Sequence, residues 1–214
     1  FDVVLRHLEG NLDTDGFTGG IGAVDADSTS ETRQKFGRFS SNLTLFDGQW
    51  QHKLSVSGND TDNESFSTSN YFSQGEKQKL AYQTDVFANQ GKLDHRLTLA
   101  AEHEEEDFAS QSAWSTIDRS TEVNSFIFEY GLDFDDRYHA TIAGRQDNND
   151  IFRDAQTYRL TLAGWLTDTV RAHASKGSGV KNPTLRELFG STPTYTGNPN
   201  LTPEKNTTWD AGVE

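Results

Sequence analysis

Four aspartates near the start of the chain are the residues best suited to bind a metal ion. They stand in two pairs, Asp13 with Asp15 and Asp25 with Asp27, and the first pair lies in the turn-like sequence Asp13-Thr14-Asp15-Gly16. Calcium takes about six to eight oxygen ligands, which carboxylates around a tight turn can supply. The closing glutamate of an EF-hand loop is absent. The pattern therefore predicts a calcium site or, as the simpler interpretation, an acidic loop solvated by water.

Other chemistry-bearing residues lack the spacing that catalysis needs. The run His103-Glu104-Glu105-Glu106-Asp107 has no second histidine four residues on, so it is not a zinc protease motif and is better explained as the charged end of a strand. Gly19-Gly20-Ile21-Gly22 neither follows a buried strand nor opens a helix, and no nucleophile elbow or P-loop is present. The sequence gives no support to an enzyme.

Composition excludes further classes of protein. The 214 residues contain no Cys, which removes disulfides, zinc-thiolate sites and iron-sulfur clusters. The net charge of -14 argues against a nucleic-acid partner. No stretch reaches the roughly 20 consecutive apolar residues of a membrane helix. The chain begins with Phe1, has no Met and shows no signal peptide, so we expect an internal piece of a longer protein.

Apolar and polar residues alternate along most of the chain, which is the pattern of strands with one apolar face. In the segment 36–47, for example, Phe39, Leu43 and Leu45 share one parity and Arg38 and Asn42 the other. The alternating segments are 36–47, 50–57, 77–88, 93–102, 125–134, 138–145, 158–162, 170–175 and 206–214, with 2–9 as a weaker candidate. We therefore expect about ten strands, each of about 9 to 13 residues, close to the ~9 to 11 that cross a bilayer.

Short and long connections alternate between these strands. Short turns lie near 48, 90, 136 and 168, and longer polar segments cover 10–33, 59–76, 105–121, 148–155 and 179–205. This alternation is typical of an up-and-down outer-membrane β-barrel. The aromatic residues Trp50, Phe134, Tyr138 and Trp165 lie near the short turns and would form an interfacial girdle. A soluble antiparallel sandwich is the alternative interpretation.

Full charges on the polar parity favour the barrel over the sandwich. A water-filled lumen accommodates such charges, either as ion pairs or as separately hydrated groups. The charged residues of this parity include Arg38, Lys53, Arg96, Arg145, Arg159, Arg171, Asp85, Asp94, Glu129 and Asp133.

The sequence from Ala172 to Glu214 resembles the barrel of TonB-dependent outer-membrane receptors. The resemblance rests on the strand-loop-strand text ASKGSGVKNPTLRELFG followed by GNPNLTPEKNTTWDAGVE. The matching positions include Lys181, Pro183, Thr184, Leu185, Gly197, Asn198, Pro199, Asn200, Leu201, Pro203, Glu204, Lys205 and Trp209. Order and spacing are most similar to the cobalamin-receptor branch and are also compatible with siderophore receptors.

The resemblance implies an all-β fold, an antiparallel up-and-down transmembrane β-barrel. Residues 1–214 would supply about ten strands of a larger barrel of about 22 strands, without its plug domain, signal peptide and remaining strands. The implied function is active import of cobalamin or a ferric siderophore across the bacterial outer membrane. The implied partners are TonB, through the missing plug, and membrane lipid and lipopolysaccharide. By their charge alone, the acidic loops would either repel anionic lipopolysaccharide or be bridged to it by divalent ions. In cobalamin receptors such loops carry calcium, which makes Asp13, Asp15, Asp25 and Asp27 candidates. A passive porin or an adhesin-type barrel is the alternative.

All four prolines of the chain crowd into one connection, between Pro183 and Pro203. Proline fixes φ and removes a backbone donor, so we expect an ordered fold-back. It would act as a constriction at the lumen mouth or, as the simpler interpretation, as a corner that brings Trp209 into register. Ten strands alone would also leave two unpaired edges, near 2–9 and 206–214.

Overall fold

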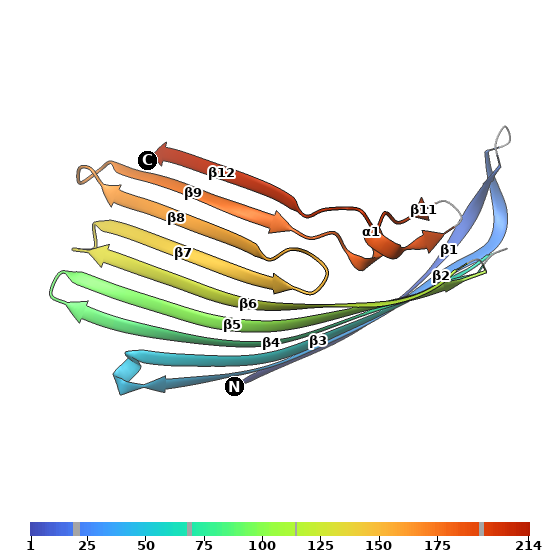
Figure 1. Cartoon of the computed structure of the whole chain (residues 1–214), viewed down its shortest axis with the longest axis horizontal. Coiled ribbons are helices and arrows are strands. Elements are labelled where there is room, and N and C mark those ends of the chain that lie inside the picture. Colours follow the sequence, from blue (N-terminus) through green and yellow to red (C-terminus); the bar gives the residue numbers. More distant parts are fainter. Residues whose placement is uncertain (19–21, 68–69, 114, 193–194) are drawn as a thin grey trace.

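The structure, a computed structural model, describes residues 1–18, 22–67, 70–113, 115–192 and 195–214, without the side chains of 17, 18, 23, 26 and 27. Ten strands form one antiparallel sheet in the order β1-β2-β3-β4-β5-β6-β7-β8-β9-β12 (Figure 1). The strands are β1 (Asp2–Thr18), β2 (Gly22–Leu45), β3 (Trp50–Phe66), β4 (Tyr71–Gln90), β5 (Leu93–Ser112), β6 (Thr116–Phe134), β7 (Tyr138–Asn149), β8 (Ala155–Trp165), β9 (Arg171–Lys181) and β12 (Glu204–Val213). Every predicted strand is present.

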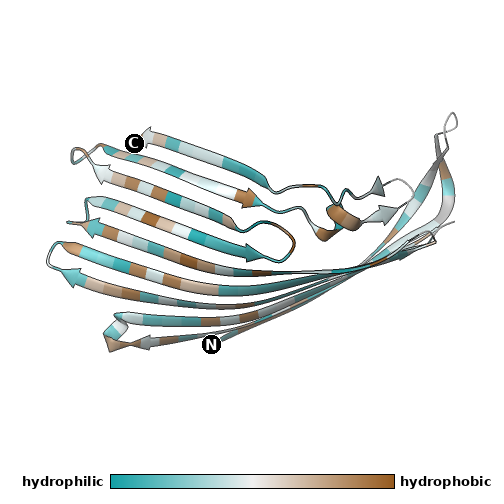
Figure 2. Cartoon of the chain, in the orientation of Figure 1, coloured by the Kyte–Doolittle hydropathy of each residue, from teal (hydrophilic) through white to brown (hydrophobic). Residues whose placement is uncertain are grey.

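The side chains of the strands are mainly apolar on one face of the sheet and mainly polar or charged on the other. The register places Leu54 opposite Tyr82, and places Phe126 in the same row, so these side chains share what we call the apolar face. The next residues along the strands, such as Lys53 and Arg145, share the opposite, polar face. Figure 2 shows the resulting alternation of brown and teal along β3 to β9.

Several predicted loops are in fact strand. The segments 10–33, 59–76 and 105–121 largely continue the ladders of β1 to β6, whose strands run 17 to 24 residues instead of 9 to 13. Both faces are polar there, as at Asp107 opposite Ser120, so hydrophobic periodicity gives no signal while the backbone hydrogen bonds continue. The connections at 148–155 and 179–205 remain between strands, as predicted.

The short turns lie where the sequence predicts them. The 3-10 turn η1 (Phe46–Gly48) joins β2 to β3, and Asp135 and Asp136 take positive φ values of 56° and 54° between β6 and β7. Aromatic rings stack beside two of these turns, with centroids 6.1 Å apart for Phe46–Trp50 and 6.3 Å for Phe134–Tyr138. These rings support the predicted girdle.

Trp165 does not join that girdle. Tyr138 pairs with Gly164, so Trp165, one residue on, belongs to the polar face opposite Arg171. The outward position beside Gly164 is filled instead by Leu166, which is 64% exposed. The sequence prediction was wrong here, because Leu162 lies on the apolar face and Trp165 is an odd number of residues, three, further along the strand. Successive side chains of a strand alternate between its faces, so Trp165 lies on the polar face.

The apolar face has no protein covering among the described residues. The buried apolar side chains of the described residues, Ala155, Leu185 and Leu188, do not belong to this face. On the apolar face, large hydrophobic side chains stay exposed, such as Phe126 at 58% and Leu162 at 62%. A sandwich would bury this face against a second sheet. The described part of the chain also has no helix that is long and apolar enough to cross a membrane.

The two predicted free edges are β1 and β12, and Figure 1 shows the sheet open between them. The other elements belong to the connection from β9 to β12. They are helix α1 (Leu185–Phe189) and a two-stranded ribbon of β10 (Ser191–Thr192) and β11 (Tyr195–Thr196).

Candidate functional site: the polar face and the fold-back

Arg145 is the centre of a charged network on the polar face of β4 to β7. Its Nη1 lies 2.9 Å from Glu102 Oε2, and its Nε lies 2.6 Å from Asp147 Oδ1. Its Nη2 donates to the hydroxyl of Ser125, which is 2% exposed and itself donates to Asp147. Lys79 Nζ approaches Glu102 from the other side at 3.0 Å. Four strands are thus tied side by side through charge-assisted hydrogen bonds.

The network continues away from the short turns. Lys77 Nζ lies 2.6 Å from Glu104 Oε1, and Lys79 also reaches Glu104 at 3.9 Å. Glu104 faces Lys79 across the β4–β5 ladder, and Glu102 faces Ser125 across the β5–β6 ladder. These alternating charges largely neutralise one another in the middle of the polar face.

The residues predicted to line the lumen all lie on the polar face, and most have a partner. Arg96 pairs with Glu129 at 2.6 Å, and Arg38 pairs with Asp2 at 3.2 Å. Asp133 contacts His139. The other contacts are Arg171 with Glu214, Asp85 with Thr98 and Gln83, and Asp94 with Asn89. In the described part of the chain, Lys53 and Arg159 have no ion-pair partner. The ion-pair interpretation is therefore confirmed for Arg38, Arg96, Glu129, Arg145 and Arg171.

Sequence reasoning missed the partners at the centre of this network. Glu102 and Asp147 lie 45 residues apart in numbering (147 − 102 = 45), and only the sheet register brings both to Arg145. Their parity is visible in the sequence, but the pairing of β5, β6 and β7 is not.

The fold-back, which we define as residues 182–203, begins with a capped helix. The Thr184 side chain accepts a hydrogen bond from the Glu187 N–H at 3.2 Å, and the Glu187 carboxylate accepts from the Thr184 N–H at 2.8 Å. This reciprocal pair is a capping box, which satisfies backbone donors at the start of α1. Hydrogen bonds from the Thr184 backbone and hydroxyl hold the pKa of Glu187 below its usual value of 4.5.

The second half of the fold-back closes onto the end of the same helix. The Gly197 N–H donates to the Gly190 carbonyl at 2.7 Å, and the Asn198 N–H donates to the Glu187 carbonyl at 2.9 Å. A Cβ at Gly197 would lie 2.7 Å from the Leu188 carbonyl carbon, so a side chain has no room there. The predicted ordered fold-back is present, and the Gly197-Asn198 sequence is its closing contact.

The fold-back is attached to the polar face of β5 and β6 at the end far from the short turns (Figure 1). Leu185 and Leu188 are each 2% exposed, and the Arg119 guanidinium lies 5.3 Å from the centre of the Phe189 ring. Asn182 Nδ2 donates to Asn149 Oδ1 at 3.0 Å. This position fits a constriction over the polar face.

The fold-back also sets the register of the last strand. Beyond Pro203, Glu204 pairs with Lys181, Lys205 with Val180 and Trp209 with Lys176. The geometry thus agrees with both interpretations of this segment. Whether the remaining motif positions, Pro183, Pro199, Asn200 and Leu201, contribute to function stays a prediction; in the structure Asn200 N–H bonds to Asn198 Oδ1 at 3.0 Å, within the turn.

The predicted calcium ligands are spread along the β1–β2 hairpin. Asp13 pairs with Thr29, Asp15 lies at a register shift between Thr14 and Gly16, and Asp25 is exposed in β2. The side chain of Asp27 lies outside the described residues. The described residues contain no group of three acidic or histidine side chains that could hold a metal ion. Calcium binding stays a prediction.

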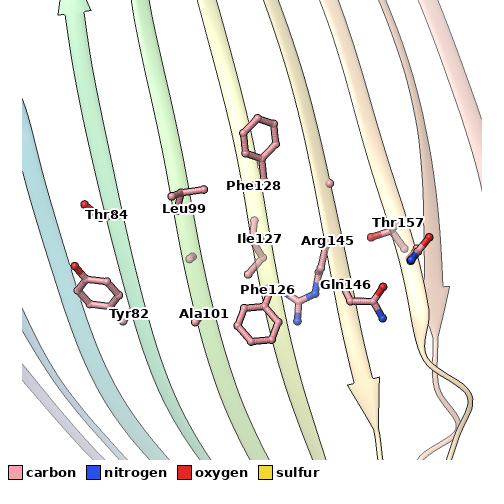
Figure 3. A pocket seen from close by; sticks show the side chains of 13 residues that line it. Tyr82, Thr84, Leu99, Ala101, Phe126, Ile127, Phe128, Arg145, Gln146 and Thr157 are labelled. Carbon is pink, nitrogen blue, oxygen red and sulfur yellow. The ribbon is translucent and has the colours of Figure 1, made fainter.

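A hollow of about 720 Å³ lies on the apolar face across β4 to β8 (Figure 3). Tyr82, Leu99 and Phe126 stand around it, and Ala101 and Gly144 leave space between them. Its lining is mainly apolar, and it opens on the side of the sheet away from the charged network. We therefore regard it as part of the apolar face.

Comparison with known proteins identifies the fold. Residues 3–214 match the family described as TonB dependent receptor-like, beta-barrel. Similar solved structures include the siderophore receptor PirA from Pseudomonas aeruginosa, with a TM-score of 0.69 and 16% identity over 99% of this chain and 43% of that one.

Two further similar structures have different solutes in their descriptions. One is a double mutant of the Serratia marcescens hemophore receptor HasR in complex with HasA and heme, with a TM-score of 0.74 and 15% identity over 87% of this chain and 36% of HasR. The other is the RagAB peptide transporter, with a TM-score of 0.62 and 15% identity over 87% of this chain and 28% of that one. The chain spans less than half the length of each of these three proteins. The family match covers residues 3–214, and the strands of the sheet follow one another in the up-and-down order of a β-barrel. The chain therefore belongs to the TonB-dependent receptor β-barrel family.

Proposed function

We propose that this chain forms part of the barrel wall of an outer-membrane TonB-dependent receptor that imports a small metal chelate, cobalamin or a ferric siderophore. The observation that carries the proposal is the two-faced sheet of a TonB-dependent receptor barrel, apolar on one side and ion-paired on the other. The apolar face matches the lipid surface of a barrel, and the polar face matches a hydrated lumen.

The division of labour follows from these two faces. The Arg145 network holds the lumen wall in one shape, because moving one strand would separate several charge pairs at once. Lumen charges without a partner in the described chain, such as Lys53 and Arg159, are available to hydrogen-bond a plug domain. The solute binds at the end of the lumen where the fold-back lies, and energy from TonB moves the plug.

Energy dependence is the sharpest test of this function. The full-length receptor is produced in cells that lack their own receptors, with and without functional TonB, and uptake of labelled cobalamin and of a labelled ferric siderophore is measured separately. We expect one of the two solutes to accumulate above its external concentration only when TonB is functional. A receptor without its TonB-interacting segment is the matched control.

Other outcomes would contradict the proposal. Passive entry of both solutes without TonB indicates a porin. Neither solute entering, with attachment of the cells to a surface, indicates an adhesin. TonB-dependent uptake of a peptide or of heme alone would keep the active-transport mechanism and overturn the solute class.

A further inference from the structure

The part of β3 that extends beyond the ends of β7 and β8 separates acidic from uncharged side chains (Figure 1). In the sequence Asn59-Asp60-Thr61-Asp62-Asn63-Glu64-Ser65, acids alternate with uncharged polar residues. Ser57, just before this segment, lies opposite Lys79 on the polar face of the sheet. Because successive side chains alternate between the faces, the acids lie on the opposite face. The residues of the segment on the polar face are Asn59, Thr61, Asn63 and Ser65.

The neighbouring strands continue this uncharged surface. Thr61 lies between Gln34 of β2 and Gly75 of β4, and Asn63 lies opposite Thr32. A Cβ at Gly75 would meet nothing within 4 Å, so there is open space beside Thr61. The residues that we call the amide patch are Thr32, Gln34, Asn59, Thr61 and Asn63.

The amide patch has hydrogen-bonding groups to offer a solute. Thr32 Oγ1 donates to Asn63 Oδ1 at 2.9 Å, which leaves Asn63 Nδ2 to donate elsewhere. In the part of the chain that the structure describes, Asn63 Nδ2 and the side chains of Gln34 and Asn59 have no hydrogen-bond partner. An amide side chain donates through its nitrogen and accepts through its oxygen. These groups therefore match the amides, hydroxamates or hydroxyls of a solute without adding charge.

The cations beside the amide patch are already neutralised. On the polar face of β4, Lys77 Nζ lies 2.6 Å from Glu104 Oε1, and Lys79 Nζ lies 3.0 Å from Glu102 Oε2. An anionic solute would have to separate one of these pairs and leave a carboxylate of the wall unpaired, which is unfavourable.

Two charged side chains near the patch on the polar face of β1 to β5 have no ion pair among the described residues. They are Arg6, at the free edge opposite Phe36, and Glu106, opposite Lys77. Both lie in the row of Asn59, and their charges are opposite. This wall therefore offers no cluster of free cations to a carboxylate or a catecholate.

We propose that the amide patch binds an uncharged, amide- or hydroxamate-bearing part of the solute and selects against anionic chelates. A site made of hydrogen-bonding groups discriminates strongly, because a solute that lacks the matching groups leaves those of the site unpaired. The inference rests on the proposed function and narrows it to the uncharged members of the solute classes named there.

Binding to the purified full-length receptor tests this preference. The probes are cyanocobalamin, an uncharged ferric tris-hydroxamate and an anionic ferric tris-catecholate, and affinities are measured by isothermal titration calorimetry. We expect at least one uncharged probe to bind about tenfold more tightly than the tris-catecholate. Asn63→Asp, which replaces the amide donor by a carboxylate of similar shape, should weaken binding of that probe about tenfold. Asp62→Asn, the reverse change on the opposite face, is the matched control and should leave the affinity unchanged.

A cation added to the patch should shift the preference the other way. Thr61→Lys places an unpaired ammonium group beside the open space at Gly75 and should raise the affinity for the tris-catecholate about tenfold. Gln74→Lys adds the same charge on the opposite face, across from Asp62, and should have little effect.

Several results would overturn the inference. Wild-type receptor that binds the tris-catecholate as tightly as the uncharged probes does so without any variant, and it leaves import of a ferric siderophore intact. Equal effects of Asn63→Asp and Asp62→Asn also overturn it. Absence of binding by all three probes overturns the proposed solute class together with the inference. Uptake with and without TonB is measured in parallel, so a failure of active transport is seen separately.

Discussion

The ten-stranded sheet and the fold-back that is attached to one end of it bury apolar side chains in different ways. The sheet leaves its large hydrophobic side chains exposed on one face. The fold-back, in contrast, contains two of the three buried apolar side chains of the described chain, Leu185 and Leu188. The sheet relies on its surroundings for the hydrophobic contribution to stability, whereas the fold-back carries a small core of its own.

This difference predicts where mutations act. Replacing an apolar side chain of the sheet should change stability through its contact with lipid, because the backbone hydrogen bonds between the strands remain in place. Substitutions in the fold-back should act locally, through packing and capping, and leave the barrel folded. Each prediction below tests one side of the comparison in the full-length receptor.

Leu188→Ala should give the largest effect. The side chain is 2% exposed, and removing it leaves a cavity that costs about 2–5 kcal/mol of local stability. Hydrogen exchange of the 182–203 peptides should accelerate while exchange of β7 and β8 stays unchanged. Leu201→Ala, at a position 39% exposed, is the control and should change little. Unchanged exchange in Leu188→Ala would contradict a separate core.

Ile142→Arg should destabilise the sheet by about 2–4 kcal/mol in a bilayer, since Ile142 is the third of six outward positions on β7. Thr141→Arg, one residue earlier and on the polar face, should cost much less. Urea unfolding in lipid vesicles measures both. Equal costs would show that the apolar face does not contact lipid.

Arg145→Gln should cost about 1–2 kcal/mol, between the values for exposed and buried charged hydrogen bonds. It leaves Glu102, whose side chain is 18% exposed, and Asp147 without their shared cation. Arg171→Gln is the control, because its single pair with Glu214 lies near a turn and both side chains are more than a third exposed, 36% and 58%. A double-mutant cycle with Glu102→Gln isolates the coupling. Additive losses would exclude a cooperative network.

Substitutions in the capping box should give the smallest effect on stability. The contribution of the capping box should also depend on pH. Thr184→Ala should destabilise α1 by about 1 kcal/mol. Because the pKa of Glu187 is lowered by folding, its contribution is complete above the usual pKa of 4.5 and is lost as pH falls through the lowered value. A spin label attached at Asn200→Cys in otherwise wild-type protein should become more mobile as the pH is lowered. Glu187→Gln should remove that pH dependence, and a variant that still shows it would contradict the role of Glu187.

Much of the fold could be predicted from alternation alone. Period two identifies every strand of the sheet, and Asp-Gly and Asp-Asp sequences mark the turns at 47–48 and 135–136. The outward extensions of β1 to β6 could not be predicted, because residues that are polar on both faces form the same backbone ladder as alternating ones. The loop prediction for Asp13 and Asp25 was wrong for this reason.

The candidate site could likewise be predicted only in part from the sequence. The parity of Arg145, Lys53 and Glu129 follows from the sequence, and so does the fold-back, whose prolines and glycines exclude a strand. The contacts of Arg145 with Glu102 and Asp147 do not follow, since they depend on which strands pair and in which register. The sequence by itself determined the strands, their two faces and the bend. Only the tertiary structure decided which charges meet, because side chains on different strands become neighbours only once the register is set.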